Sequence, residues 1–68
     1  MDYIVGKTFI AICELGTFGA AAEALNVTQT TITARIKSLE NELNCSLFTR
    51  NKSGAILTKN GEHFKSYA

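Results

Sequence analysis

The 68-residue sequence contains no proline, and it has neither an internal repeat nor a low-complexity stretch. Without such a stretch, nothing in the sequence indicates a linker between two domains. A chain of this length rarely forms two independent cores. We therefore expect residues 1–68 to form one domain.

The sequence also lacks the apolar run of about 18 residues that a membrane-spanning helix requires. Its N-terminus has neither the basic stretch nor the small-residue cleavage site that export signals carry. These absences predict a cytoplasmic protein with no membrane partner.

Side chains suited to metal binding or catalysis are scarce. The two cysteines, Cys13 and Cys45, lie too far apart to be a metal-binding pair, and the single histidine, His63, has no thiol near it in the sequence. Cys13 follows Phe9 by one helical turn in an apolar segment, which favours a buried thiol over a redox sensor. No close set of nucleophile and base, phosphate-binding glycine loop or carboxylate pair is present. The sequence predicts no disulfide, metal site, cofactor or enzymatic activity.

The net charge of +1 is small for a nucleic-acid-binding protein, but the charges are unevenly distributed. Residues 1–27 contain one basic and three acidic residues, whereas residues 28–68 contain six basic and three acidic residues. Such a local excess of positive charge can neutralise phosphates even when the whole domain is nearly neutral. The pattern alone is weak evidence, because solvated lysine and arginine occur on any surface.

The N-terminal part has the spacing of two helices. Apolar residues recur every three or four positions from Asp2 to Leu15, with Asp2 as a candidate N-cap and Gly16 as the stop. Thr17 is expected to cap a second helix, Phe18 to Leu25, whose alanines favour helix and allow another helix to approach closely.

A third helix is predicted from the cap Thr28 to the neighbourhood of Asn44. Its apolar residues fall at spacings of four, three and four, so that one stripe of the helix should be buried. The stripe consists of Ile32, Ile36, Leu39 and Leu43. A short helix followed, after a three-residue turn, by a longer one is typical of a helix-turn-helix unit, here over residues 18–43.

After Asn44 the periodicity changes. Residues 46–49 and 55–58 are short extended candidates on either side of a basic tip that contains Gly54, which predicts a β-hairpin. Thr58 is expected to cap a last helix over residues 59–68, with Phe64 and Tyr67 on one apolar side. The predicted fold is mainly α: a three-helix winged helix-turn-helix with a two-stranded wing and the start of a fourth helix.

Burial of the apolar stripe turns a second face of the third helix outward, where it could enter the major groove. This face carries Thr30, Ala34, Lys37 and Asn41, with Thr31 and Thr33 beside them. Gln29, in the first turn, has an amide that matches an adenine edge or bonds to a phosphate. The alternative is an ordinary solvated face, but threonine is a poor helix former, and a specificity surface would explain why four occur within six residues.

The basic residues of this region have two possible roles each. Arg35 lies beside the apolar stripe, which favours a phosphate contact or an intramolecular pair over base recognition. Lys37 either solubilises the surface or contacts DNA. Arg50 and Lys52 belong either to a plain connection between strands or to a loop that contacts the DNA backbone or minor groove.

A dense set of motif residues extends over nearly the whole chain. It consists of residues 17–25 (TFGAAAEAL), Val27-Thr28-Gln29, Ile32-Thr33, Ile36-Lys37, Leu39-Glu40, Glu42-Leu43, Leu47-Phe48, Arg50, Leu57-Thr58 and Gly61. This set resembles the N-terminal domain of LysR-type transcriptional regulators. The resemblance implies that Gln29, residues 30, 31, 33 and 34, and the hairpin tip contact DNA. It also implies homodimers or tetramers, and a small-molecule effector bound by a C-terminal domain that this sequence lacks. The chain is therefore expected to be a fragment or a separately expressed DNA-binding domain.

The sequence departs from the family pattern at four positions. The family often has proline or serine at Thr30, arginine at Ala34 and arginine at Ser53, which leaves Lys52 as the substitute cation at the tip. Gly6 stands where a large aliphatic residue is usual, and glycine within a helix costs roughly 1 kcal/mol.

The leading hypothesis is therefore sequence-specific binding of double-stranded DNA for bacterial transcription regulation, acting at the nucleoid. The alternative is a winged-helix module that binds another protein. The candidate DNA-contacting residues are Thr28, Gln29, Thr30, Thr31, Thr33, Ala34, Arg35, Lys37, Arg50, Lys52 and Ser53.

Overall fold

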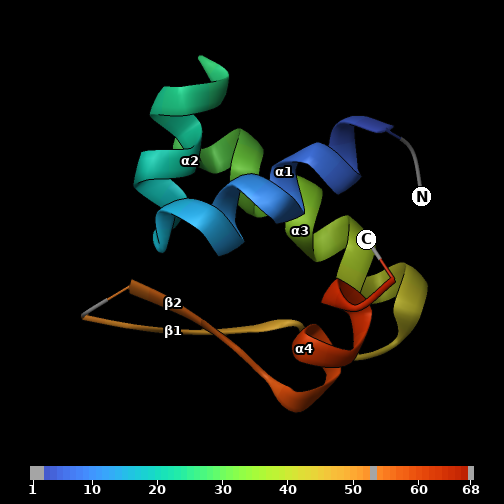
Figure 1. Cartoon of the computed structure of the whole chain (residues 1–68). Coiled ribbons are helices and arrows are strands. Elements are labelled where there is room, and N and C mark those ends of the chain that lie inside the picture. The colour runs from blue at the N-terminus through green and yellow to red at the C-terminus, as the bar shows by residue number, and fades with distance from the viewer. Residues whose placement is uncertain (1–2, 53, 68) are drawn as a thin grey trace.

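Three helices, a two-stranded hairpin and a short fourth helix follow one another along the chain (Figure 1). The computed structural model describes residues 3–52 and 54–67. The elements are α1 (Tyr3–Leu15), α2 (Phe18–Leu25), α3 (Gln29–Leu43), β1 (Phe48–Asn51), β2 (Gly54–Leu57) and α4 (Lys59–Lys65). The mainly α winged helix-turn-helix fold predicted from the sequence is confirmed, with α1 to α3 packed together and the hairpin lying along one side of them.

Threonine caps begin three of the helices. The side chains of Thr17, Thr28 and Thr58 accept hydrogen bonds from the main-chain N–H groups of Ala20, Thr31 and Gly61, at 2.9, 3.1 and 3.0 Å. Asparagines end two helices in the left-handed region, because Asn26 has φ 58° and Asn44 has φ 57°. The predicted caps Thr17, Thr28, Thr58 and Asn44 are confirmed, as is Gly16 after α1, with φ 86°. The predicted cap Asp2 lies outside the described residues.

The core gathers apolar side chains from α1, α2, α3 and the start of the wing. Its buried members are Phe9, Ile12, Phe18, Ala21, Ala22, Ile32, Ile36, Leu39, Leu47 and Phe48. Phe9 lies among the aromatic rings, with centroids 5.3 Å from Phe48 and 4.9 Å from Phe64. The core therefore ties the wing and α4 to α1.

Two predicted core positions are wrong. Leu43 was expected in the buried stripe of α3, but 39% of it is exposed, because the helix ends at this residue and turns away at Asn44. Tyr67 is 76% exposed and lies beyond the end of α4, so that Phe64 alone packs against the core. Conversely, Thr8 is fully buried although it is polar.

The bounds of both wing strands differ from the prediction: the first covers 48–51 instead of 46–49, and the second covers 54–57 instead of 55–58. The first strand begins at Phe48 instead of residue 46, and Asn51 pairs with Gly54. The reason is that residues 46 and 47 bond to other elements: the Leu47 N–H donates to Glu40 Oε2 at 2.7 Å, and the Leu47 carbonyl accepts from the Thr58 N–H at 3.0 Å. Arg50 consequently belongs to β1, not to the tip.

The second strand is held against the body of the domain. The Ala55 N–H donates a hydrogen bond to the Gly16 carbonyl at 2.9 Å. Gly54 has φ 137°, and a Cβ added there would lie 2.5 Å from the same carbonyl oxygen. Only glycine permits this approach without strain, and the approach docks the wing on the α1–α2 turn.

Candidate nucleic-acid interface

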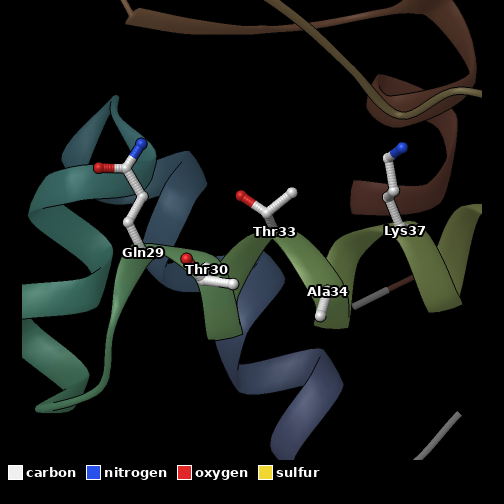
Figure 2. Close-up of a pocket in the computed structure, with 5 residues that line it drawn as sticks. All are labelled: Gln29, Thr30, Thr33, Ala34 and Lys37. Atoms are coloured by element: carbon white, nitrogen blue, oxygen red, sulfur yellow. The ribbon is translucent and has the colours of Figure 1, made fainter.

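One face of α3 forms a shallow groove on the surface. The groove is lined by Gln29, Thr30, Thr33, Ala34 and Lys37. Figure 2 shows Gln29, Thr33 and Lys37 projecting from the helix in one direction, with Thr30 and Ala34 beside them. Thr33 is half-buried and the other four are exposed. The outward face predicted from helical periodicity is therefore formed, and Asn41, farther along α3, is also exposed.

The four threonines at the start of α3 divide into two pairs. Thr28 caps the helix, and its hydroxyl lies 3.0 Å from the Thr31 hydroxyl, so that these two side chains bond to each other. In the part of the chain that the structure describes, the hydroxyls of Thr30 and Thr33 have no hydrogen-bond partner. They remain available to an incoming ligand.

Arg35 points to the other side of the helix. It is half-buried, and its Nη1 donates to the Thr8 hydroxyl at 3.2 Å. The Thr8 hydroxyl in turn donates to the Ile4 carbonyl at 2.9 Å. Of the two roles predicted for Arg35, the intramolecular one is the one that the structure shows, and this contact explains why Thr8 is buried.

A second, more polar hollow lies where the wing meets the helices. It is lined by Thr17, Phe18, Gly19, Gln29, Arg50, Asn51, Lys52 and Gly54. Gln29 borders this hollow as well as the groove on α3. Its side chain lies over Gly19, where an added Cβ would be 3.5 Å from Gln29 Oε1. The start of α3 and the tip of the wing thus face the same side of the molecule.

Arg50 and Lys52 are exposed and supply positive charge to this side. The Arg50 guanidinium carbon lies 4.2 Å from the centre of the Phe18 ring. Asn51 Oδ1 accepts a hydrogen bond from the Gly54 N–H at 3.1 Å across the tip, which shapes the turn. Ser53, which was predicted to contact DNA, lies outside the described residues.

The structure adds Phe18, Gly19 and Asn51 to the residues that border the site. The family motif contains Phe18 and Gly19, and the resemblance assigned the hairpin tip to DNA, but the residue types alone indicate no such role. Phe18 and Gly19 fit an ordinary helix start, and the role of Asn51 depends on the hairpin register. Across residues 3–52 and 54–67, no three metal-ligating side chains are grouped in a way that could hold an ion. Within the same ranges, no helix combines the length and apolarity of a membrane span.

The burial of Cys13 raises the pKa of its thiol, although the neighbouring Lys65 opposes the shift. The thiol is half-buried on α1 and packs against the core. A raised pKa disfavours the reactive thiolate. The buried role predicted for Cys13 therefore agrees with its environment.

Residues 7–62 match a family described as bacterial regulatory helix-turn-helix proteins, lysR family. The HTH-type transcriptional regulator HdfR of Salmonella newport is 44% identical over all 68 residues, and the chain spans 24% of the length of that relative. Among solved structures, a CbnR_DBD-DNA complex has 37% identity and a TM-score of 0.93, with 98% of this chain and 77% of that chain covered. A BenM_DBD/benA site 1 DNA complex has 30% identity and a TM-score of 0.91, with 98% and 75% covered.

Proposed function

Because the chain belongs to the LysR family of bacterial regulatory helix-turn-helix proteins, we propose that it binds duplex DNA sequence-specifically for transcription regulation. The groove-lining face of α3 enters the major groove, and the wing lies along the DNA backbone. The observation that carries this proposal is the position of Gln29, which borders both the groove on α3 and the polar hollow at the tip of the wing. A single duplex can therefore meet both surfaces. The two similar structures that are complexes with DNA support the same assignment.

The interface residues have different roles in this proposal. Gln29, Thr30, Thr33 and Ala34 meet base edges, because they are short or amide-bearing side chains at the start of the groove. Lys37, Arg50, Lys52 and Ser53 contact phosphates. Thr28 and Thr31 hold the first turn of α3 together, so that the N-terminus of the helix is fixed where it faces the DNA backbone. Arg35 stays in its contact with Thr8 and supports α3 from behind.

We further propose that the protein acts in the bacterial cytoplasm and that two copies bind the two halves of a symmetric site. One helix-turn-helix contacts only a half-site, so that pairing makes the second contact intramolecular and raises affinity by roughly 10²–10⁴. In a longer protein that carries this domain, a homodimer or tetramer would present two DNA-binding domains to the site. An effector would bind outside residues 1–68.

The test begins with selection of bound sequences from a random duplex library. Gln29→Ala is then compared with the parent chain on the selected and on a random duplex. The loss should be about 1–3 kcal/mol on the selected duplex and smaller on the random one, because an amide on a base edge contributes discrimination. Ser38→Ala is the matched control, since Ser38 is exposed on α3 but borders neither hollow, and it should change neither affinity.

Equal losses on both duplexes would reassign Gln29 to a phosphate. If no sequence is enriched and binding to duplex DNA does not depend on salt, then the protein-binding alternative replaces the proposal, because phosphate neutralisation always produces a steep salt dependence.

A further inference from the structure

Phe18 joins the hydrophobic core to the DNA-facing side of the molecule. It is 4% exposed, and its ring meets the Phe48 ring edge to face, with centroids 5.7 Å apart and an interplanar angle of 82°. The core therefore fixes the orientation of this ring. The Arg50 guanidinium lies over the ring, 4.2 Å from its centre.

This arrangement suits a phosphate contact by Arg50. A guanidinium on an aromatic ring is held through its flat face by the ring quadrupole, which leaves the N–H donors at its edge. Those donors match the oxygen atoms of a phosphate. A long arginine side chain that is already held also loses less conformational entropy when DNA binds.

The backbone of Arg50 is fixed as well. Arg50 pairs with Ala55 in the hairpin, and the Ala55 N–H bonds to the Gly16 carbonyl, one residue before the α2 cap. Both the main chain and the guanidinium of Arg50 are therefore anchored at the α1–α2 turn and the first turn of α2.

Arg50 also lies beside the groove-lining face of α3. It borders the polar hollow together with Gln29, and it borders a smaller hollow together with Thr33 and Lys37. Glu40, the acidic residue at the smaller hollow, accepts hydrogen bonds from the main-chain N–H groups of Leu47 and Phe48. Three of the five groove-lining residues of α3 thus share a hollow with Arg50.

We propose that Phe18 is a positioning residue for DNA binding, whose ring holds the Arg50 guanidinium at the junction of the wing and α3, where it meets a backbone phosphate. This inference rests on the proposed function, with Arg50 as the contact and Phe18 acting through it.

The test is a double-mutant cycle on the affinity for duplex DNA, measured by titration at several salt concentrations. Arg50→Ala should weaken binding to every sequence and reduce the salt slope by about one. Phe18→Leu should weaken binding about two- to fivefold, the range of an exposed cation–π contact. In the Arg50→Ala background, Phe18→Leu should cause no further loss, because the two residues act as a unit.

Phe9→Leu is the matched control. Phe9 is as deeply buried and contacts two aromatic rings, but its ring contacts lie on the side of Phe48 and Phe64. Any effect of Phe9→Leu on DNA affinity should therefore add to that of Arg50→Ala. Additive losses for Phe18→Leu as well would overturn the proposal and leave Phe18 a plain core residue.

A second measurement needs neither DNA nor a folded variant. In the NMR spectrum of the free parent chain, the side-chain proton signals of Arg50 should be shifted upfield by the Phe18 ring current. Signals at random-coil positions would overturn the proposal even if Phe18→Leu does not fold. Absence of DNA binding by the parent chain would instead overturn the proposed function, so that the two failures are distinguishable.

Discussion

Substitution of Gly61 by alanine tests how α4 is seated on the domain. Gly61 is buried at the start of α4, and a Cβ added there would overlap the Leu47 carbonyl oxygen and lie 2.8 Å from Leu57 Cδ2. The Leu47 carbonyl cannot simply rotate away, because it accepts a hydrogen bond from the Thr58 N–H at 3.0 Å. The helix would have to retreat by about 1 Å to restore ordinary contact distances.

The expected loss follows from two opposing effects. Overpacking of this kind costs about 1–3 kcal/mol. Alanine gains at most about 1 kcal/mol over glycine in helix propensity, and less so near a helix end. Retreat of α4 also weakens the contact between Phe64 and Phe9, whose ring centroids are now 4.9 Å apart. We therefore expect Gly61→Ala to lower the free energy of unfolding by about 1–3 kcal/mol, with Tm falling by about 4–8 °C for each kcal/mol.

Urea denaturation followed by circular dichroism measures this loss directly. Gly19→Ala is the matched control, because Gly19 also lies in the first turn of a helix and its added Cβ would meet only Gln29 Oε1 at an ordinary 3.5 Å. That variant should be unchanged or stabilised by up to about 1 kcal/mol. If Gly61→Ala is as stable as Gly19→Ala, the close packing of α4 on Leu47 is wrong.

Three further outcomes are expected. Lys52→Ala should lower DNA affinity equally on all sequences and reduce the salt slope by about one, and an unchanged slope would remove the wing tip from the interface. Glu40→Gln should lower the free energy of unfolding by about 1 kcal/mol in urea denaturation, because a neutral amide replaces the carboxylate that accepts from two main-chain N–H groups. Undiminished stability would show that the negative charge of Glu40 contributes nothing to these hydrogen bonds. Because burial raises the pKa of Cys13, its thiol at pH 8 is more fully protonated and should react with iodoacetamide more slowly than free cysteine does. A Cys45→Ser variant allows the reaction of Cys13 to be measured alone.

The helices could be predicted because their signals are local. Thr17 and Thr28 occupy cap positions immediately before apolar periodicity, and Asn44 tolerates the left-handed turn that ends α3. The same periodicity predicted the outward face of α3. Each of these features depends on residues within one or two turns, so that the sequence contains the information directly.

The features that could not be predicted depend on distant residues. Residues 46–49 have the alternation of a strand, but Glu40 and Thr58 hold Ser46 and Leu47 outside the ladder. These hydrogen bonds displace the strand, so that Arg50 lies within β1 opposite Ala55, one pair before the turn. The contact of Arg50 with Phe18 follows from that register, and no local pattern in the sequence indicates it.

The threonines at the start of α3 divide into two that stabilise the helix and two that do not. Thr28 and Thr31 are explained by the fold, since their hydrogen bonds close the first turn. Thr30 and Thr33 disfavour helix by about half a kcal/mol each relative to alanine. In the described part of the chain, their hydroxyls gain no hydrogen bond in return. Because both line the groove beside Gln29, the proposed contact with DNA is a physical reason for a hydroxyl at these positions.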